Sequence, residues 1–146
     1  MARSAKSTVP WRNRSPYGWW LASYIVRFEL RGSRPRTDRS RCMAWENTII
    51  VRGKTREIAY RRALAVATVG TGTFEKHGDP PGRLARWVFE GLTSLVAIYE
   101  PLEDGSEIAW TEYSNITLAK LRRKVKVKRE LETFVDETPN PRLERP

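Results

Sequence analysis

The chain has 146 residues, of which 40% are hydrophobic and one is cysteine, and its 27 lysines and arginines outnumber 17 aspartates and glutamates to give a net charge of +10. This length predicts one domain with a buried core, and a lone cysteine excludes a fold held together by disulfides. No segment has the ~18 to 20 consecutive apolar residues of a membrane helix, and the first ten residues lack the apolar part of a secretory signal, so we expect a cytoplasmic protein with no membrane partner.

The positive charge is concentrated in a few segments. Residues 1–16 carry four basic and no acidic side chains, and residues 120–130 carry seven basic side chains and one acidic, whereas residues 100–112 carry five carboxylates and no base. Segregated basic charge favours nucleic-acid binding, because every phosphate that is neutralised releases a counterion. It is equally typical of a solvated surface on an arginine-rich chain, so charge alone leaves both interpretations open.

The first half of the chain predicts two strands and a helix. Residues 17–30 are rich in aromatic and β-branched side chains and become amphipathic toward their end, which indicates a strand that is buried on both sides at its start. Gly, Pro and polar residues then form a loop over 32–40, and residues 41–51 resume as a second, antiparallel strand. Residues 54–69 predict a helix with Thr55 as its N-cap and Gly70 as its stop, whose packed side is mostly alanine and can lie close to a sheet.

The second half predicts a hairpin and a basic extension. After a Gly- and Pro-rich loop over 71–82, an apolar run continues to residue 102 with a break at Gly91, which divides two strands or redirects one. A tight turn over 103–106 leads to an alternating strand over 107–113, completing a C-terminal hairpin. Beyond residue 115, helical spacing favours a helix that begins near Thr117, although residues 124–128 alternate with period two.

The predicted organisation is therefore a small α+β domain between basic ends. Residues 1–16 form a basic flexible arm, 17–114 the domain, 115–135 a basic and possibly helical extension, and 136–146 a disordered tail. The domain is an antiparallel sheet of about four or five strands with one main helix packed on a face.

A succession of short motifs resembles the bacterial domain of unknown function 4288 family over about residues 17–113. The motifs are an aromatic strand start (Trp19, Trp20, Leu21, Ala22), a Glu-Asn strand (residues 46–51), a helix with Ala59, Tyr60 and Ala63, the segment Trp87, Val88, Phe89, Gly91 and Leu92, then Leu95, Ile98 and an acidic turn over 102–107. The resemblance implies a small α+β domain of bacterial or phage-like origin and no established activity, cofactor or catalytic residue.

The residue types give little support to catalysis. Cys42, at a strand start, is interpreted as a small buried side chain, and His77 as a solvated loop residue, so one chain cannot assemble a zinc site and no cofactor is expected. The carboxylates at 103 and 104 occupy a turn, which seldom separates the pKa values of an acid and base pair. Glu46, in an apolar strand, is expected to be buried and paired with Arg27 or Arg52.

The six tryptophans suggest a core and one further role. Those in predicted strands, including Trp110, are interpreted as core residues, whereas Trp11 stands between arginines of the basic arm and either anchors a partner or folds back on the domain. We therefore predict a non-catalytic binding or protein-interaction module with an unknown protein partner, contacted by Trp11, Glu103 and Asp104. The alternative is a basic nucleic-acid-binding protein whose phosphate contacts are Arg122, Arg123, Lys124, Lys126, Lys128 and Arg129.

Overall fold

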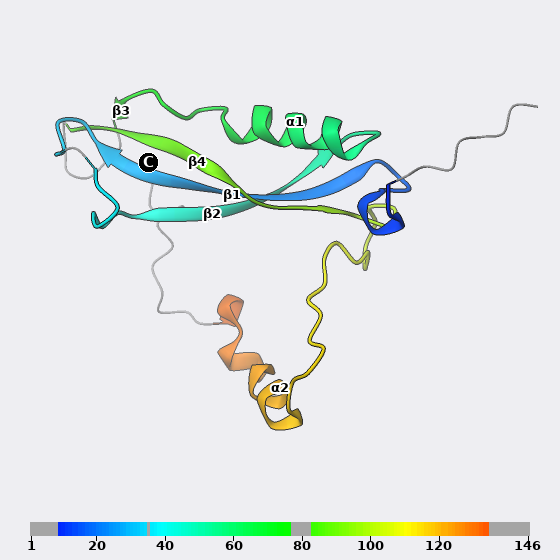
Figure 1. Cartoon of the computed structure of the whole chain (residues 1–146). Helices are drawn as coiled ribbons and strands as arrows, with labels where there is room; N and C mark the ends of the chain where they lie inside the picture. The colour runs from blue at the N-terminus through cyan, green and yellow to red at the C-terminus, as the bar shows by residue number, and fades with distance from the viewer. Residues whose placement is uncertain (1–8, 35, 77–82, 135–146) are drawn as a thin grey trace, which may run out of the picture. The chain divides into compact units, whose positions relative to one another are not determined.

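Four antiparallel strands and one α-helix form the main elements of the computed structural model, which describes residues 9–34, 36–76 and 83–134 (Figure 1). The chain divides into two compact units, Met1–Trp110 and Thr111–Pro146. The first unit contains the 3₁₀ turn η1 (Trp11–Asn13), β1 (Trp19–Leu30), β2 (Ala44–Arg52), α1 (Arg56–Ala67), β3 (Glu75–Lys76) and β4 (Leu84–Ala97). The strands are ordered β2-β1-β4-β3, which confirms the predicted α+β class.

Strand β1 is the centre of the sheet, and its alternation decides which side chains form the core. Trp20, Ala22 and Val26 are buried on one face, where Trp20 is 2% exposed. Trp20 pairs with Val51 of β2 and with Ala97 of β4, which are also buried. Because directly paired residues of an antiparallel sheet share a face, these three strands present one continuous apolar surface to α1.

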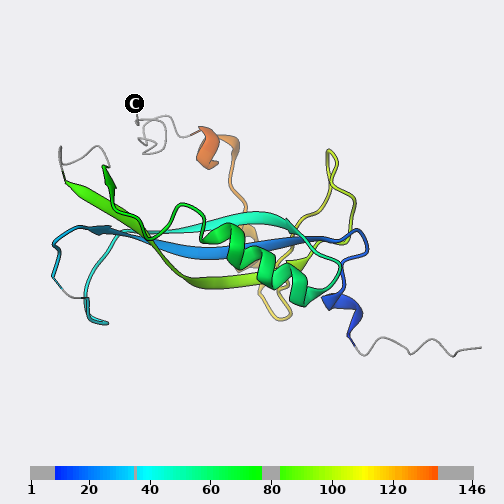
Figure 2. The ribbon, with the colours of Figure 1, turned by 90° about the horizontal axis from the view of Figure 1, so that it is seen from above.

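Helix α1 lies across that surface through its alanines (Figure 2). Thr55 caps it as predicted, since its side-chain oxygen accepts a hydrogen bond from the Ile58 amide at 3.2 Å. Ala59, Ala63 and Ala67 are buried. The approach is closest at Gly53, where a Cβ atom would lie 2.7 Å from the backbone nitrogen of Ala59. Glycine at position 53 therefore sets how near the helix can come to the end of β2.

The apolar run after residue 83 forms one strand, so the break at Gly91 redirects β4 and does not divide it. Two register shifts against β1 leave Thr93 and Glu90 as extra residues without a paired partner. Such bulges bend a strand and increase its twist. Gly91 lies between the two extra residues and pairs with Ile25.

The predicted C-terminal hairpin is wrong, because residues 98–117 contain neither strand nor helix. The turn itself forms, with the Ser106 amide donating to the Glu103 carbonyl at 3.1 Å. Side chains then take backbone groups that a strand would pair: the Glu107 amide donates to the Glu100 carboxylate at 2.7 Å, and the Ser106 hydroxyl donates to the Pro101 carbonyl. These hydrogen bonds between side chains and the backbone compete with the hydrogen bonds between strands, which explains the missing strand.

The second unit contains α2 (Leu118–Lys124) and the 3₁₀ turns η2 (Lys128–Glu130) and η3 (Glu132–Phe134). Thr117 caps α2 by accepting a hydrogen bond from the Lys120 amide at 3.3 Å, which confirms a helix beginning near Thr117. Across the described residues, no helix is long and apolar enough to cross a membrane.

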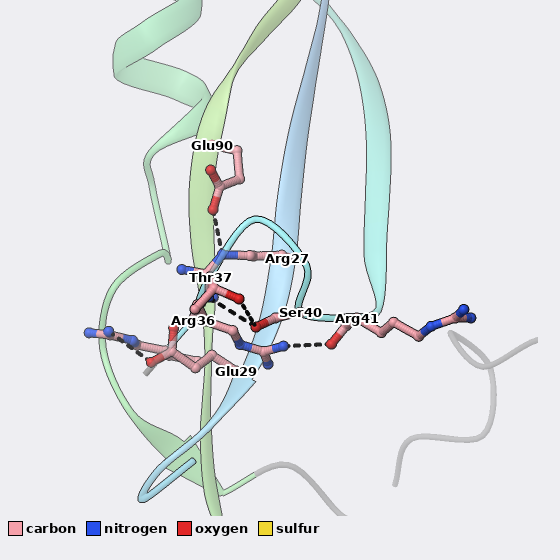
Figure 3. Close-up of polar contacts among 8 residues, drawn as sticks. Arg27, Glu29, Arg36, Thr37, Ser40, Arg41 and Glu90 are labelled. Atoms are coloured by element: carbon pink, nitrogen blue, oxygen red, sulfur yellow. Dashed lines mark hydrogen bonds and ion pairs between the residues drawn. The ribbon is translucent and has the colours of Figure 1, made fainter. Parts of the chain in front are cut away.

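A network of ion pairs joins four charged side chains on the far face of the sheet, the face opposite α1 (Figure 3). Arg27 of β1 lies between two carboxylates: its Nη1 is 2.7 Å from Glu29, and its Nε donates to Glu90 of β4. Arg86 also contacts Glu29 at 3.1 Å. The hydrogen bond from Arg27 is the main reason that the pKa of Glu29 lies below its usual 4.5; burial opposes this shift, and Arg86 adds to it.

We predict that Gly53→Ala lowers the free energy of unfolding by about 1–3 kcal/mol, because the added methyl group overlaps the backbone of α1. Urea unfolding measures this loss. Adding Ala59→Gly in the same protein will not restore stability, since the closest overlaps are with the backbone nitrogen and Cα of Ala59, at 2.7 and 3.0 Å, and the Ala59 Cβ is farther away, at 3.3 Å. A stability of Gly53→Ala equal to that of the unmodified protein would contradict the contact.

The Glu29 network predicts a pH-dependent stability. A carboxyl whose pKa is lowered by folding stabilises the fold above its unfolded pKa, and this contribution disappears as pH falls through the folded value. Glu29→Gln should therefore be less stable than the unmodified protein at about pH 7, and the difference should shrink toward about pH 2.5. Urea midpoints at the two pH values, with Glu103→Gln as a control outside the sheet, test this. A difference that is the same at both values would refute it.

Candidate functional site

The second half of the predicted arm, residues 9–16, is held against one end of the sheet. The Ser15 hydroxyl lies 2.7 Å from the Trp19 carbonyl and 2.9 Å from the Ile98 carbonyl. The Tyr99 hydroxyl donates to the Arg12 carbonyl. These contacts join η1 to the start of β1 and the end of β4, so the described part of the arm folds back on the domain, while residues 1–8 lie outside the described residues.

Three aromatic rings form a ladder beside this arm. The ring centroids of Trp11 and Tyr99 are 5.7 Å apart, and those of Tyr99 and Trp110 are 5.3 Å apart. Trp11 is 62% exposed and Trp110 is 52% exposed, so the rings contact one another and still face solvent. The prediction of Trp110 as a core residue is therefore wrong: because residues 107–113 form no strand, its ring packs on Tyr99 and stays half in water.

A groove runs from the arm to the first turns of α1. It consists of three hollows with volumes of about 600, 300 and 430 Å³, and Arg56 lines all three. Trp20 lines the hollows of about 600 and 300 Å³, and its indole nitrogen, which donates to the Gly53 carbonyl at 2.8 Å, holds the ring in place. In both overall views η1 and the start of α1 lie at the same end of the sheet (Figures 1 and 2).

The charge of the groove is strongly positive. Its basic lining residues are Arg12, Arg14, Lys54, Arg56 and Arg61. Against these, Glu57 is the one acidic side chain among the described lining residues, it lines two of the three hollows, and Arg56 contacts it at 3.1 Å. The pKa of Glu57 is lowered by a backbone hydrogen bond at the helix start and by Arg56, so this carboxylate stays charged and offsets part of one arginine.

The residues predicted as partner contacts occupy different places in this unit. Trp11 lines the groove. Glu103 and Asp104 are exposed in the turn over residues 103–106 and line none of the three hollows. The structure thus brings Trp11 together with cations and aromatic rings and leaves the acidic turn apart.

The predicted nucleic-acid contacts are exposed in the second unit. Lys124 stacks on Tyr113 with 5.0 Å between its ammonium nitrogen and the ring centroid, and Lys128 stacks on Phe134 at the same distance. Lys126 contacts Glu132. The other members of the set are Arg122, Arg123 and Arg129, and all six are solvent-exposed.

Two residues considered for chemistry lie where the sequence does not place them. Cys42 is exposed, because β2 begins only at Ala44 and the cysteine belongs to the preceding loop. Glu46 is exposed on the far face and accepts a hydrogen bond from Thr93 at 2.6 Å, so the expected buried pair with Arg27 or Arg52 is wrong. His77 lies outside the described residues. In the part that is described, no group of three or more His, Cys, Asp and Glu side chains is placed to hold a metal ion.

Sequence reasoning missed Tyr99, Lys54 and Arg56 as site residues. Each belongs to an element boundary: Tyr99 follows β4, and the two basic residues flank the N-cap of α1. The predicted antiparallel pairing of the first two strands was the available signal for Lys54 and Arg56, since it brings the residues just after β2 next to those just before β1. The pairing of β1 with β4, which brings Tyr99 to the same place, is seen only in the structure.

A family model independently covers this fold and most of the groove. No curated protein and no solved structure matches the chain. The model for the domain of unknown function DUF4288 matches residues 19–110, which include all four strands, α1 and the three residues Trp20, Tyr99 and Trp110. The match ends where the first compact unit ends, at Trp110. The chain therefore belongs to the DUF4288 family.

Proposed function

We propose that this domain is a non-catalytic binding module and that the groove holds an acidic segment of a protein partner. The observation that carries the proposal is the combination, in three hollows that share Arg56, of exposed aromatic rings with five cations and, among the described residues, a single carboxylate. Exposed aromatic side chains contribute large contact area at low entropic cost, and arginines add charge-assisted hydrogen bonds to carboxylates.

The shape of the groove favours an extended chain as its ligand. Three adjoining hollows of about 600, 300 and 430 Å³ form a series, whereas a small-molecule site is usually one enclosed cavity. An extended peptide can place an apolar side chain on the Trp11 and Tyr99 rings and carboxylates near Arg56 and Lys54. The acidic turn with Glu103 and Asp104 would then contact basic residues of the same partner outside the groove. The cytoplasmic location and bacterial origin inferred from the sequence stay predictions.

The test uses two synthetic libraries of ten-residue peptides, one built from Asp, Glu, Leu and Tyr and the other with Lys in place of the acidic residues. Tryptophan fluorescence should report saturable binding of acidic peptides and little binding of basic ones. Arg56→Glu should weaken binding at least about tenfold, because it reverses a charge shared by all three hollows. Trp11→Ala should weaken it by a similar factor through loss of an anchor.

Arg122→Glu is the matched control, since it reverses an equally exposed arginine in the second unit. It should leave peptide affinity within about twofold of the unmodified protein. Absence of binding by either library at about 1 mM, or equal effects of Arg56→Glu and Arg122→Glu, would contradict the proposal.

A second candidate function is nucleic-acid binding by the second unit, favoured by the exposure of all six cations that the sequence predicts as phosphate contacts. Of these, Lys126 has an ion pair in the described residues, so five offer charge for phosphates. The prediction is that affinity for a duplex or single-stranded oligonucleotide falls steeply with salt, and that Arg122→Gln with Arg123→Gln reduces the slope by about one for each of these arginines that neutralises a phosphate. Arg56→Gln with Arg61→Gln is the charge-matched control. Binding that does not change with salt would exclude this role.

A further inference from the structure

Strand β2 forms one edge of the sheet, and half of its backbone groups point away from β1. The Phe28 amide donates to the Met43 carbonyl at 2.9 Å, and the Gly53 amide donates to the Gly18 carbonyl at 2.9 Å. The odd-numbered residues between 43 and 53 therefore direct their amides and carbonyls toward β1. Because an antiparallel ladder alternates, the residues between them direct their amides and carbonyls outward. These are Ala44, Glu46, Thr48, Ile50 and Arg52.

Among the described residues, the outer edge of β2 lacks most of the features that prevent strand pairing. Proteins protect exposed edges with bulges, prolines, lysines or a covering segment. Strand β4 has two bulges, whereas the register of β2 on β1 is unbroken from Trp19↔Arg52 to Arg27↔Ala44. The nine residues of β2 include neither Pro, Gly nor Lys, and within the described chain no other strand pairs with this edge.

The two charged side chains of β2 lean over the sheet and leave the edge accessible. Glu46 reaches across β1 to Thr93, at 2.6 Å. The Arg52 guanidinium lies over the Trp19 ring of β1, 5.0 Å from its centroid. Between them Ile50 is 46% exposed, a large apolar side chain at an otherwise regular edge.

We propose that β2 pairs antiparallel with β2 of a second copy of this chain, with Ile49 at the two-fold axis. In this register Glu46 of each copy lies opposite Arg52 of the other, and Thr48 lies opposite Ile50. All four residues direct their backbone groups outward, so the required hydrogen-bond phase is met. The opposite charges at positions 46 and 52 select this register, because cross-strand pairs of opposite charge are stabilising and like charges are destabilising.

This dimer is independent of the proposed groove function. The groove is built from the arm, the start of α1 and the end of β4, and none of the strand residues Ala44–Arg52 lines it. Pairing joins two four-stranded sheets into one continuous sheet and removes the β2 edge from solvent.

Sedimentation equilibrium between about 5 and 500 μM tests the proposal, with a reversible dimer expected in this range. Thr48→Pro should make the protein monomeric, since it removes an outward amide and no backbone hydrogen bond to β1. It also removes the hydrogen bond between the Thr48 and Ser23 hydroxyls, at 2.8 Å. Circular dichroism confirms that the variant folds. Glu46→Arg and Arg52→Glu should each weaken the dimer at least about tenfold, because each substitution enters the two-fold interface twice and creates like-charge pairs.

The double variant Glu46→Arg with Arg52→Glu separates pairing from any structural role of these residues. It restores opposite charges across the axis and should regain a dimer affinity within about threefold of the unmodified protein, although it replaces the side chains that lie against Thr93 and Trp19. A protein that is monomeric at about 500 μM, or a dimer unaffected by Thr48→Pro, would overturn the proposal. Single charge variants that weaken the dimer without rescue in the double variant would overturn the proposed register.

Discussion

The close approach of α1 to Gly53 determines where the functional groups of this domain lie. A residue with a side chain at position 53 would push the helix away from the sheet, since the added Cβ would lie 2.7 Å from the Ala59 nitrogen. The same glycine accepts the hydrogen bond of the Trp20 indole through its carbonyl, at 2.8 Å. One residue thus sets the height of α1 above the sheet and the position of a ring that lines the groove. The basic residues on either side of Thr55 are placed by that contact.

The groove and the β2 edge illustrate two ways in which a small sheet can offer surface to a partner. At the groove, side chains from segments far apart in sequence meet because β1 and β4 are antiparallel neighbours, and the arm is fixed by Ser15 and Tyr99. At the edge, backbone groups of a single strand are available because nothing in its sequence interrupts their regular spacing. The first surface depends on tertiary packing, whereas the second depends on one strand. Either could change without affecting the other.

The sequence predicts the strands and helix of this protein better than it predicts the surroundings of single residues. Thr55, Gly70 and the alanine pattern predict α1, and Thr117 predicts the start of α2, because caps and periodicity are local. The hairpin expected to end with a strand over 107–113 fails because the Glu100 carboxylate takes the Glu107 amide and the Ser106 hydroxyl takes the Pro101 carbonyl, a competition that alternation does not reveal. Glu46 is exposed because its position in β2 places its side chain on the face opposite α1. Cys42 is exposed because β2 starts later than expected. Of the groove, Trp11 alone was predicted, since the other residues meet only in three dimensions.

The two bulges of β4 have a joint consequence for its side chains. Near its end, Leu95 and Ala97 pair with Ala22 and Trp20 on the helix-facing side, and so do Phe89 and Trp87 with Val26 and Phe28 near its start. Between the bulges the helix-facing residue is Leu92, which has the opposite parity. The first extra residue moves the helix-facing positions from odd-numbered to even-numbered residues, and the second moves them back. Deleting Glu90 or Thr93 alone would move the side chains on one side of the deletion to the opposite face of the sheet. The two extra residues must therefore be gained or lost together.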